Sequence, residues 1–367
     1  MTHVVTGSSE GVGVDGIRMT RCGFLAGGLA LAGTAVLGPT LGAGTALASS
    51  SPPITDCAGW GARPNSDIVP IWNRRPVKIL VHHTATPNGG DLSEGAGYSL
   101  ARSIQRFHMD TRGWLDTGQH FTISRGGFVM EGRHRSLEVL RSGTRQVEGA
   151  HCTGQNVVAV GIENEGTYID TVPTGALWDS LRATCAYICI QYGIAPTELY
   201  GHRDFKNTAC PGDALYAMLP RLRGEVAGLL GRNIEGGAAH KASWPLLRPG
   251  DTGDAVTAAQ YLLRDNGLTE VIPNGHYDAA TSDAVLRYQY ATGAEDVGMI
   301  GGETWPVLAR TVRSSEDSDA AKAVETLAAR RGVESVPDVV DRPDWQRLLG
   351  TGGAPADLTA DPTGPPR

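Results

Sequence analysis

The sequence predicts an α/β domain, with a mixed central sheet flanked by helices, followed by a small three-helix domain. Three observations lead to this prediction. Short β-branched runs alternate with segments of helical periodicity over residues 57–232, a Gly/Ala-rich stretch follows at 233–244, and short helical segments occupy 245–310. At 367 residues the chain is long enough for about two domains.

The first 48 residues are predicted to form an export signal, which is removed from the mature protein. After Arg21 this segment carries no charged side chain, it is rich in Leu, Ala and Gly, and it ends in an A-L-A cleavage pattern. A membrane anchor is the alternative, because the uncharged run is long enough to cross about 30 Å of hydrocarbon. The glycines and Pro39 favour the signal, and Met19 is an alternative start. We expect a secreted protein with no stable membrane partner after cleavage.

Residues 49–56 form a Ser/Pro-rich leader to the first domain. Three runs rich in β-branched and apolar residues then predict strands, and the first and last are apolar enough for central positions; they are 77–83, 120–124 and 157–163. Two segments with apolar residues at helical spacing predict helices at 98–110 and 174–193. The second helix has Thr174 as its N-cap and Gly193 at its end.

The second domain contains an internal repeat. The motif A-V-x-x-x-Q-Y occurs at 255–261 and again at 284–290, which predicts two short helices with similar packing roles. The remainder of the chain, 311–367, is acidic and rich in Pro and Gly. We expect it to form a largely disordered tail, with a helix around 319–331.

Charge and cysteine content narrow the possible functions. The formal net charge of -7 gives no basic surface for nucleic acid, so we expect no such partner. Cleavage after residue 48 removes Cys22 and leaves Cys57, Cys152, Cys185, Cys189 and Cys210. An odd number of cysteines outside the cell leaves one thiol unpaired or bound to a metal. Cys185 and Cys189 share one helix face, so a bond between them is awkward, and either could pair with Cys57 or Cys152.

Three candidate metal ligands are His82, at the end of the first predicted strand, and His202 with Cys210, in the stretch GHRDFKNTACPG. Two ring nitrogens and a thiolate suit Zn²⁺, and three protein ligands leave a position open for water, as in catalytic sites. Strands of one sheet can deliver their ends to a shared edge, so Glu163 could face the metal and take a proton from water. As alternatives, the histidine pair His82–His83 could be a packed or surface feature, and Cys210 could belong to a disulfide.

Five motifs extend this pattern along the chain: WGAR at 60–63, VHHTAT at 81–86, EGAHCTGQN at 148–156, VGIENEG at 160–166 and GHRDFKNTACPG at 201–212. Taken in this order, they resemble the zinc N-acetylmuramoyl-L-alanine amidases of type 2 and the related peptidoglycan recognition proteins. The resemblance covers about residues 55–230 and implies a zinc amidase domain over 57–232.

The resemblance implies a role for several of these residues. His82, His202 and Cys210 would be the zinc ligands, Glu163 the proton acceptor, and Thr208 a group that stabilises the oxyanion. The implied reaction is hydrolysis of the amide between N-acetylmuramic acid and L-alanine in bacterial peptidoglycan. With Cys210 on zinc, four cysteines remain for up to two disulfides.

The residues implied to line the substrate groove are Gln119, His151 and Asn156. Gln119 is a departure, because many relatives have a catalytic tyrosine at this position; another branch of the family uses the glutamate that Glu163 matches. Trp114 is open between a groove and a core position. A protein that binds peptidoglycan without cutting it is therefore the alternative to the enzyme. In either case we expect a monomer associated with the cell wall.

The second domain resembles the small three-helix peptidoglycan-binding domain found on many wall hydrolases. The resemblance covers about 245–309 and rests on LRPGDTGDAVTAAQYLL, NGHYDAATSDAVLRYQYATG and GGETW. Tyr277 and Tyr288 replace the phenylalanines that are more usual there. A helical appendage without a binding role is the alternative.

Overall fold

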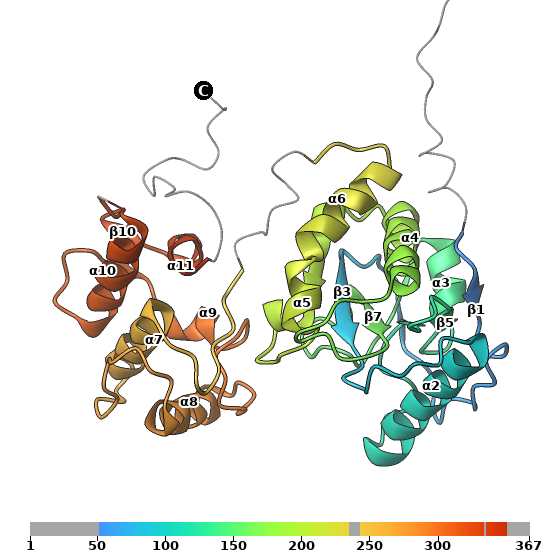
Figure 1. Cartoon of the computed structure of the whole chain (residues 1–367), viewed down its shortest axis with the longest axis horizontal. Coiled ribbons are helices and arrows are strands. Elements are labelled where there is room, and N and C mark those ends of the chain that lie inside the picture. Colours follow the sequence, from blue (N-terminus) through green and yellow to red (C-terminus); the bar gives the residue numbers. More distant parts are fainter. Residues whose placement is uncertain (1–50, 235–242, 334, 351–367) are drawn as a thin grey trace, which may run out of the picture. The chain divides into compact units, whose positions relative to one another are not determined.

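The computed structural model describes residues 51–234, 243–333 and 335–350. The predicted export signal, most of the predicted linker and the end of the predicted tail lie outside these ranges. Within them, no helix combines the length and apolar character that a membrane crossing requires. Two folded parts follow each other along the chain, one before and one after residues 235–242 (Figure 1).

The first part is built on a six-stranded sheet with the order β1-β5-β4-β7-β3-β8. Its strands are β1 (Ile54–Thr55), β3 (Lys78–His83), β4 (Phe121–Ile123), β5 (Val129–Glu131), β7 (Ala159–Asn164) and β8 (Leu199–Gly201). All neighbouring pairs are parallel except β4 with β5, which is antiparallel. A separate antiparallel pair joins β2 (Ile71–Trp72) to β6 (Gln146–Val147). The predicted mixed α/β sheet is confirmed.

The two faces of this sheet have different chemistry, because side chains alternate along each strand. On β3, Ile79 and Val81 belong to the large core, whereas Leu80 packs with Cys152 and Ala159 in a separate cluster on the other face. The parallel register pairs His82 with Glu163, so both are on the face of Leu80. One face therefore carries the apolar core, and the opposite face carries the polar groups.

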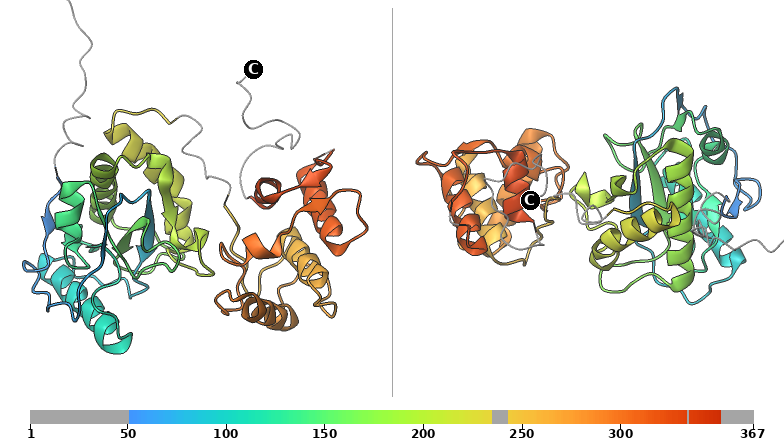
Figure 2. Two further views of the ribbon diagram at one scale, coloured as in Figure 1. Left: turned by 180° about the vertical axis from the view of Figure 1, so that it is seen from behind. Right: turned by 90° about the horizontal axis from the view of Figure 1, so that it is seen from above.

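Five α-helices accompany the sheet: α2 (Glu94–Arg106), α3 (Ser136–Ser142), α4 (Gly175–Tyr192), α5 (Asp213–Ala217) and α6 (Leu219–Leu229). Apolar residues of α4 and α6 share one core with the strands, and the two helices lie together beside β3 and β7 in Figures 1 and 2. The predicted ends of α4 are confirmed: the Thr174 side chain accepts a hydrogen bond from Leu177 N–H, and Gly193 closes the helix with φ 75°. Helix α2 continues into a π-helical turn, η1 (Phe107–Thr111).

The second part contains the three predicted helices, α7 (Asp254–Asp265), α8 (Ala279–Thr292) and α9 (Trp305–Leu308). The repeated motif places a buried glutamine at the same position of α7 and α8. Gln260 donates to His276 O and accepts from Gly275 N–H, and Gln289 donates to Met299 O and accepts from Gly298 N–H. Each glutamine ties its helix to the loop that follows, which confirms the similar packing roles of the two repeats.

The prediction of a largely disordered tail after residue 310 is wrong for the described part of that segment. The chain continues as β9 (Val312–Arg313), α10 (Asp319–Arg331), β10 (Val339–Val340) and α11 (Arg342–Leu349). The helix expected at 319–331 is confirmed. Ala and Leu side chains of α10 and Trp345 of α11 share one core with α7, and Trp345 Nε1 donates to Arg310 O at 2.8 Å. Enough apolar surface is buried to order a segment whose composition is acidic. Residues 351–367 lie outside the described residues.

The described cysteines form no disulfide, so the predicted bridges are a second correction. Cys57 packs with Trp60, Cys152 packs with Leu80, and Cys185 and Cys189 lie on the buried side of α4 in the large core. Burial raises the pKa of the Cys152 and Cys189 thiols to about 12. Counting cysteines could not predict this result, because the number of thiols says nothing about the side of the sheet on which each one lies.

Candidate metal centre and its cleft

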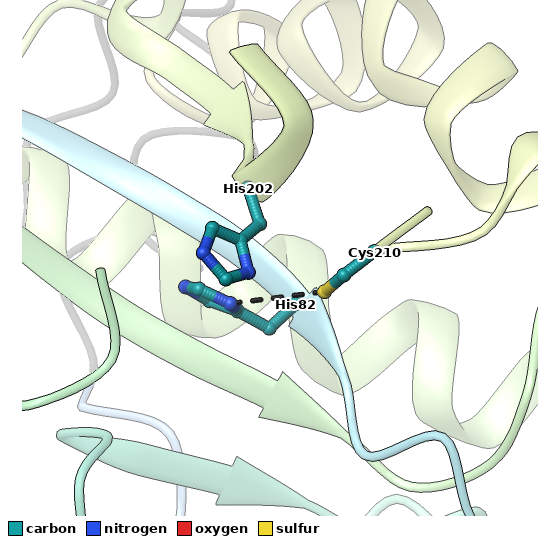
Figure 3. Close-up of side chains that lie close together, drawn as sticks. All are labelled: His82, His202 and Cys210. Carbon is teal, nitrogen blue, oxygen red and sulfur yellow. Dashed lines mark hydrogen bonds between the residues drawn. The ribbon is translucent and has the colours of Figure 1, made fainter. Parts of the chain in front are cut away.

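Three potential ligands meet at one edge of the sheet. His82 ends β3, His202 directly follows β8, and Cys210 lies in the loop before α5. Strands β3 and β8 are parallel neighbours, so the two histidines leave the sheet at the same edge. One ligand atom from each of the three residues lies within 4.8 Å of the other two. Figure 3 shows the two imidazole rings close together with the Cys210 sulfur beside them.

The loop between His202 and Cys210 is braced so that its two ends meet. The backbone N–H of Arg203 donates to Cys210 O at 3.1 Å. The guanidinium of Arg203 donates to Ala209 O and forms an ion pair with Asp213 at 2.6 Å. Asp204 accepts a hydrogen bond from Gly201 N–H at 2.8 Å. These contacts bring the cysteine back to the histidine despite their separation in sequence.

The donor set fits a zinc ion. A tetrahedral ion with bonds of about 2.0–2.3 Å holds its donors roughly 3.5 Å apart, and His82 Nδ1 lies 3.8 Å from Cys210 Sγ. Burial, together with neighbouring histidines, holds the pKa of His82 well below its usual range, so its ring is neutral and has a lone pair for a metal. The backbone N–H of His83 points at Cys210 Sγ from 3.3 Å and would stabilise a thiolate there.

Glu163 places a carboxylate next to this donor set. Its Oε1 is 3.9 Å from His82 Nδ1, and its buried Oε2 has no hydrogen-bond partner among the described residues. Burial raises the pKa of Glu163 to about 8. A carboxyl group with a pKa close to neutral pH is suited to exchange protons with a reacting molecule.

Thr208 and Gln119 also line the cleft next to the metal site. The Thr208 hydroxyl oxygen accepts from Cys210 N–H at 3.2 Å, so its own hydrogen is free to donate. Gln119 is 1% exposed and donates from Nε2 to Thr122 Oγ1 at 2.8 Å. Within the described part of the chain, Gln119 Oε1 finds no donor. A bound molecule with an N–H or O–H group could supply one.

The other two predicted groove residues lie in different surroundings. His151 lines the cleft but is mostly buried, and its Nδ1 lies 3.0 Å from His82 Nε2. Asn156 is outside the lining of this cleft, and its Oδ1 accepts from the backbone N–H groups of His151 and Cys152, both at 2.9 Å. Asn156 thus supports the loop that carries His151. Contact of either residue with a substrate stays a prediction.

Sequence reasoning missed His108, which lies in the π-helical turn and lines the cleft. Its ring stands 4.6 Å from the ring of Trp114, which also lines the cleft rather than only the core. His108 Nδ1 accepts from Gly118 N–H at 3.1 Å, and burial lowers the pKa of the ring to about 4. The histidine is neutral, with its Nε2–H available as a donor. The helical pattern extended to this residue, but it did not show that the helix widens there.

Comparisons with known proteins match each part of the chain to a known family. Residues 72–213 match the N-acetylmuramoyl-L-alanine amidase family, and residues 252–308 match a family of peptidoglycan binding domains. Peptidoglycan recognition protein 1 of Bos indicus is 32% identical over 149 residues, which are 40% of this chain and 72% of that protein. The chain belongs to the N-acetylmuramoyl-L-alanine amidase and peptidoglycan recognition protein family.

Two further similarities also concern the first part of the chain. A human N-acetylmuramoyl-L-alanine amidase is 33% identical over 162 residues, which are 44% of this chain but only 26% of the human protein. A structure of wild-type Drosophila PGRP-LB aligns with 46% of this chain and 92% of its own, at 28% identity and a TM-score of 0.40. The amidase match includes His82, His202 and Cys210, whereas the second match ends before α10.

Proposed function

We propose that this protein is a secreted zinc hydrolase that cleaves the amide between N-acetylmuramic acid and L-alanine in bacterial peptidoglycan. One observation carries the proposal: three donor atoms within 4.8 Å of one another lie beside Glu163, whose buried Oε2 has no hydrogen-bond partner among the described residues. This combination provides a ligand set and a proton acceptor in the same cleft. Membership of the amidase family supports the choice of bond.

Each residue of the cleft has a task in this reaction. Zinc held by His82, His202 and Cys210 would supply Lewis-acid polarisation of the scissile carbonyl and a lower pKa for water. Glu163 accepts a proton from the attacking water and passes it to the leaving nitrogen of L-alanine, a role that is typically worth about 10²–10⁴ in rate. The Thr208 hydroxyl donates to the oxygen that becomes negative as the water adds to the carbonyl.

The decisive test is incubation of residues 49–367, in zinc-loaded and chelator-treated forms, with peptidoglycan. Mass spectrometry of the soluble products should find free stem peptides with an L-alanine amino terminus, lost on chelation and restored by Zn²⁺. Glu163→Gln is the matched control, because it preserves the size of the side chain and removes its proton acceptor. Fragments cut within the sugar chain, or peptides cut between amino acids, would contradict the proposed bond.

The second part of the chain is proposed to hold the enzyme on the wall. The match of residues 252–308 to peptidoglycan binding domains supports this role, and a tethered second contact raises the effective concentration of enzyme at its substrate. A chain that ends at residue 234 should sediment less with intact wall while still cleaving soluble muropeptides. Equal sedimentation would assign wall retention to the first part.

A non-catalytic recognition protein is the second candidate, favoured by one observation. By the family resemblance described above, Gln119 stands where many relatives would carry a catalytic tyrosine, and its amide cannot take up or release a proton. The same incubation separates the candidates, because a recognition protein would bind the wall and release no peptide. In that event Gln119→Tyr would be the first variant to examine for gained activity.

A further inference from the structure

We propose that His151 is a positioning residue, which holds His82 in the tautomer and orientation that present Nδ1 to the metal. This inference rests on the proposed zinc site. It assigns to His151 a role that is exerted through His82 and needs no contact with the substrate.

The direction of the hydrogen bonds follows from the last acceptor in the chain of contacts. His151 Nε2 lies 3.4 Å from Ala159 O, and a carbonyl can only accept, so this nitrogen carries the hydrogen. In a neutral ring the other nitrogen, Nδ1, is then a bare acceptor. His82 Nε2 lies 3.0 Å from it and must donate. The lone pair of His82 is therefore on Nδ1, the atom that faces Cys210 and Glu163.

This chain of hydrogen bonds requires both rings to be neutral, and both are deeply buried, which disfavours the charged form. Burial is the main cause that holds the pKa of His82 and of His151 well below the usual range, and other histidines nearby lower both pKa values further. A protonated His151 would have no acceptor for His82 Nε2–H. The direction of the hydrogen bonds therefore follows from the Ala159 carbonyl, which can only accept, together with the burial of the two rings.

Two glycines pack closely against the His151 ring and restrict its position. A Cβ added to Gly161 would lie 2.5 Å from His151 Cγ, and one added to Gly149 would lie 2.6 Å from His151 Cδ2. Gly161 is on β7 and is paired in register with Leu80, on the sheet face that carries His82. The backbone of His151 is fixed by its bond to Asn156. Two glycines and one asparagine thus define the position of this ring.

A neighbouring histidine offers a matched control. His120 is as deeply buried, and its ring centroid is 5.4 Å from that of His151. Its Nε2 donates to Val147 O at 2.8 Å, and its Nδ1 accepts from Gly161 N–H at 3.0 Å. Like His151, it bonds to the backbone of β7, but it has no hydrogen bond to a proposed ligand. Removing His120 therefore tests the general effect of losing a buried imidazole.

The test is the zinc dissociation constant of the full chain, measured without substrate by competition with a chromophoric chelator. His151→Leu should weaken zinc binding by about 10–100-fold, the usual effect of removing a partner of a metal-bound histidine. His151→Gln, whose carbonyl oxygen can accept from His82 Nε2, should recover part of the affinity. Gly161→Ala should weaken binding in the same direction without altering His151 itself. His120→Asn should remain close to the wild-type value.

Two spectroscopic measurements separate positioning from a loss of folding. With Co²⁺ in place of Zn²⁺, His151→Leu should change the visible absorption bands that report the ligand geometry, whereas His120→Asn should not. In the wild-type protein, ¹⁵N shifts should show a bare Nδ1 and a protonated Nε2 on His151. Should His151→Leu fail to fold, as judged by circular dichroism, His151→Gln and Gly161→Ala carry the test.

Different results would contradict the positioning role of His151 and the proposed function. Unchanged zinc affinity in folded His151→Leu, or in the two remaining variants if that one does not fold, overturns the positioning role. The opposite tautomer of His151 in the wild-type protein also overturns it. If the wild-type chain itself binds no zinc, the proposed function fails and this inference fails with it.

Discussion

The burial of Glu163 predicts that this residue lowers the stability of the protein while it supports catalysis. Its pKa rises from 4.5 to about 8 because the carboxylate is desolvated, and its side chain is 18% exposed. The folded protein therefore keeps the proton to a higher pH than the unfolded chain does, so the unfolding free energy falls as pH rises from 4.5 towards 8. Glu163→Gln imitates the neutral form and should not show this loss.

The size of the effect follows from the shift. One pKa unit corresponds to about 1.4 kcal/mol. At pH 7 the unfolded chain has lost this proton and the folded protein must take it up again, which lowers the stability of the metal-free protein by about 3 kcal/mol relative to the glutamine variant. The difference should be close to zero near pH 4.5 and should level off above pH 8. Activity should move the other way, with hydrolysis of peptidoglycan reduced by about 10²–10⁴ in Glu163→Gln.

The assay is urea unfolding of metal-free wild type and Glu163→Gln at pH 5, 7 and 9, followed by tryptophan fluorescence and circular dichroism in parallel. Agreement of the two probes establishes a single transition for the part that contains Glu163. A stability difference that stays constant from pH 5 to pH 9 would refute the reasoning, because it would show that the carboxylate is not desolvated. A glutamine variant that is less stable at pH 9 would refute it as well.

Three further predictions concern the ligands, the oxyanion and the fold. Cys210→Ser should lose or weaken zinc, because the thiolate is one of three ligands, and metal content after dialysis measures this; retention of a full equivalent would remove Cys210 from the site. Thr208→Val should reduce kcat by about 10²–10³ with little change in zinc content, and unaltered peptide release would exclude an oxyanion role. Asp116→Asn should lower the unfolding free energy by about 3 kcal/mol at pH 6, because Asp116 is fully buried and bonded to His134 at 2.8 Å. This bond raises the pKa of His134, so the loss should shrink as pH rises through that pKa, and a loss that grows towards pH 9 contradicts the assignment.

Much of the site could be predicted from the sequence because it depends on strand ends. The runs that end in His82 and Glu163 are apolar and short, which is typical of parallel central strands, and parallel strands align their ends. The convergence of His82, His202 and Cys210 follows from this rule together with a loop that folds back. The motif order then identified the family, as the amidase match over residues 72–213 confirms.

Other features depend on packing between distant segments, and sequence patterns do not report it. The position of His151 requires that Gly149 and Gly161 both face its imidazole ring. In the sequence, each glycine alone is an ordinary loop or strand residue. The order of α10 and α11 depends on an apolar surface that α7 leaves uncovered, which outweighs an acidic composition. The number of cysteines suggested bridges, but Cys57 and Cys152 lie in clusters apart from that of Cys185 and Cys189, and the described cysteines are all free.

The strict division of the two sheet faces also limits how this family can evolve. In β3, insertion or deletion of one residue would turn Ile79 and Val81 towards the cleft and His82 into the apolar core. The adjacent His83 would then occupy the ligand face, one step out of line with Glu163. Substitutions along β3 can be accepted one at a time, but a change in its length removes the core and the ligand together. We therefore expect natural variation among relatives to preserve the length of this strand even where its apolar residues are exchanged.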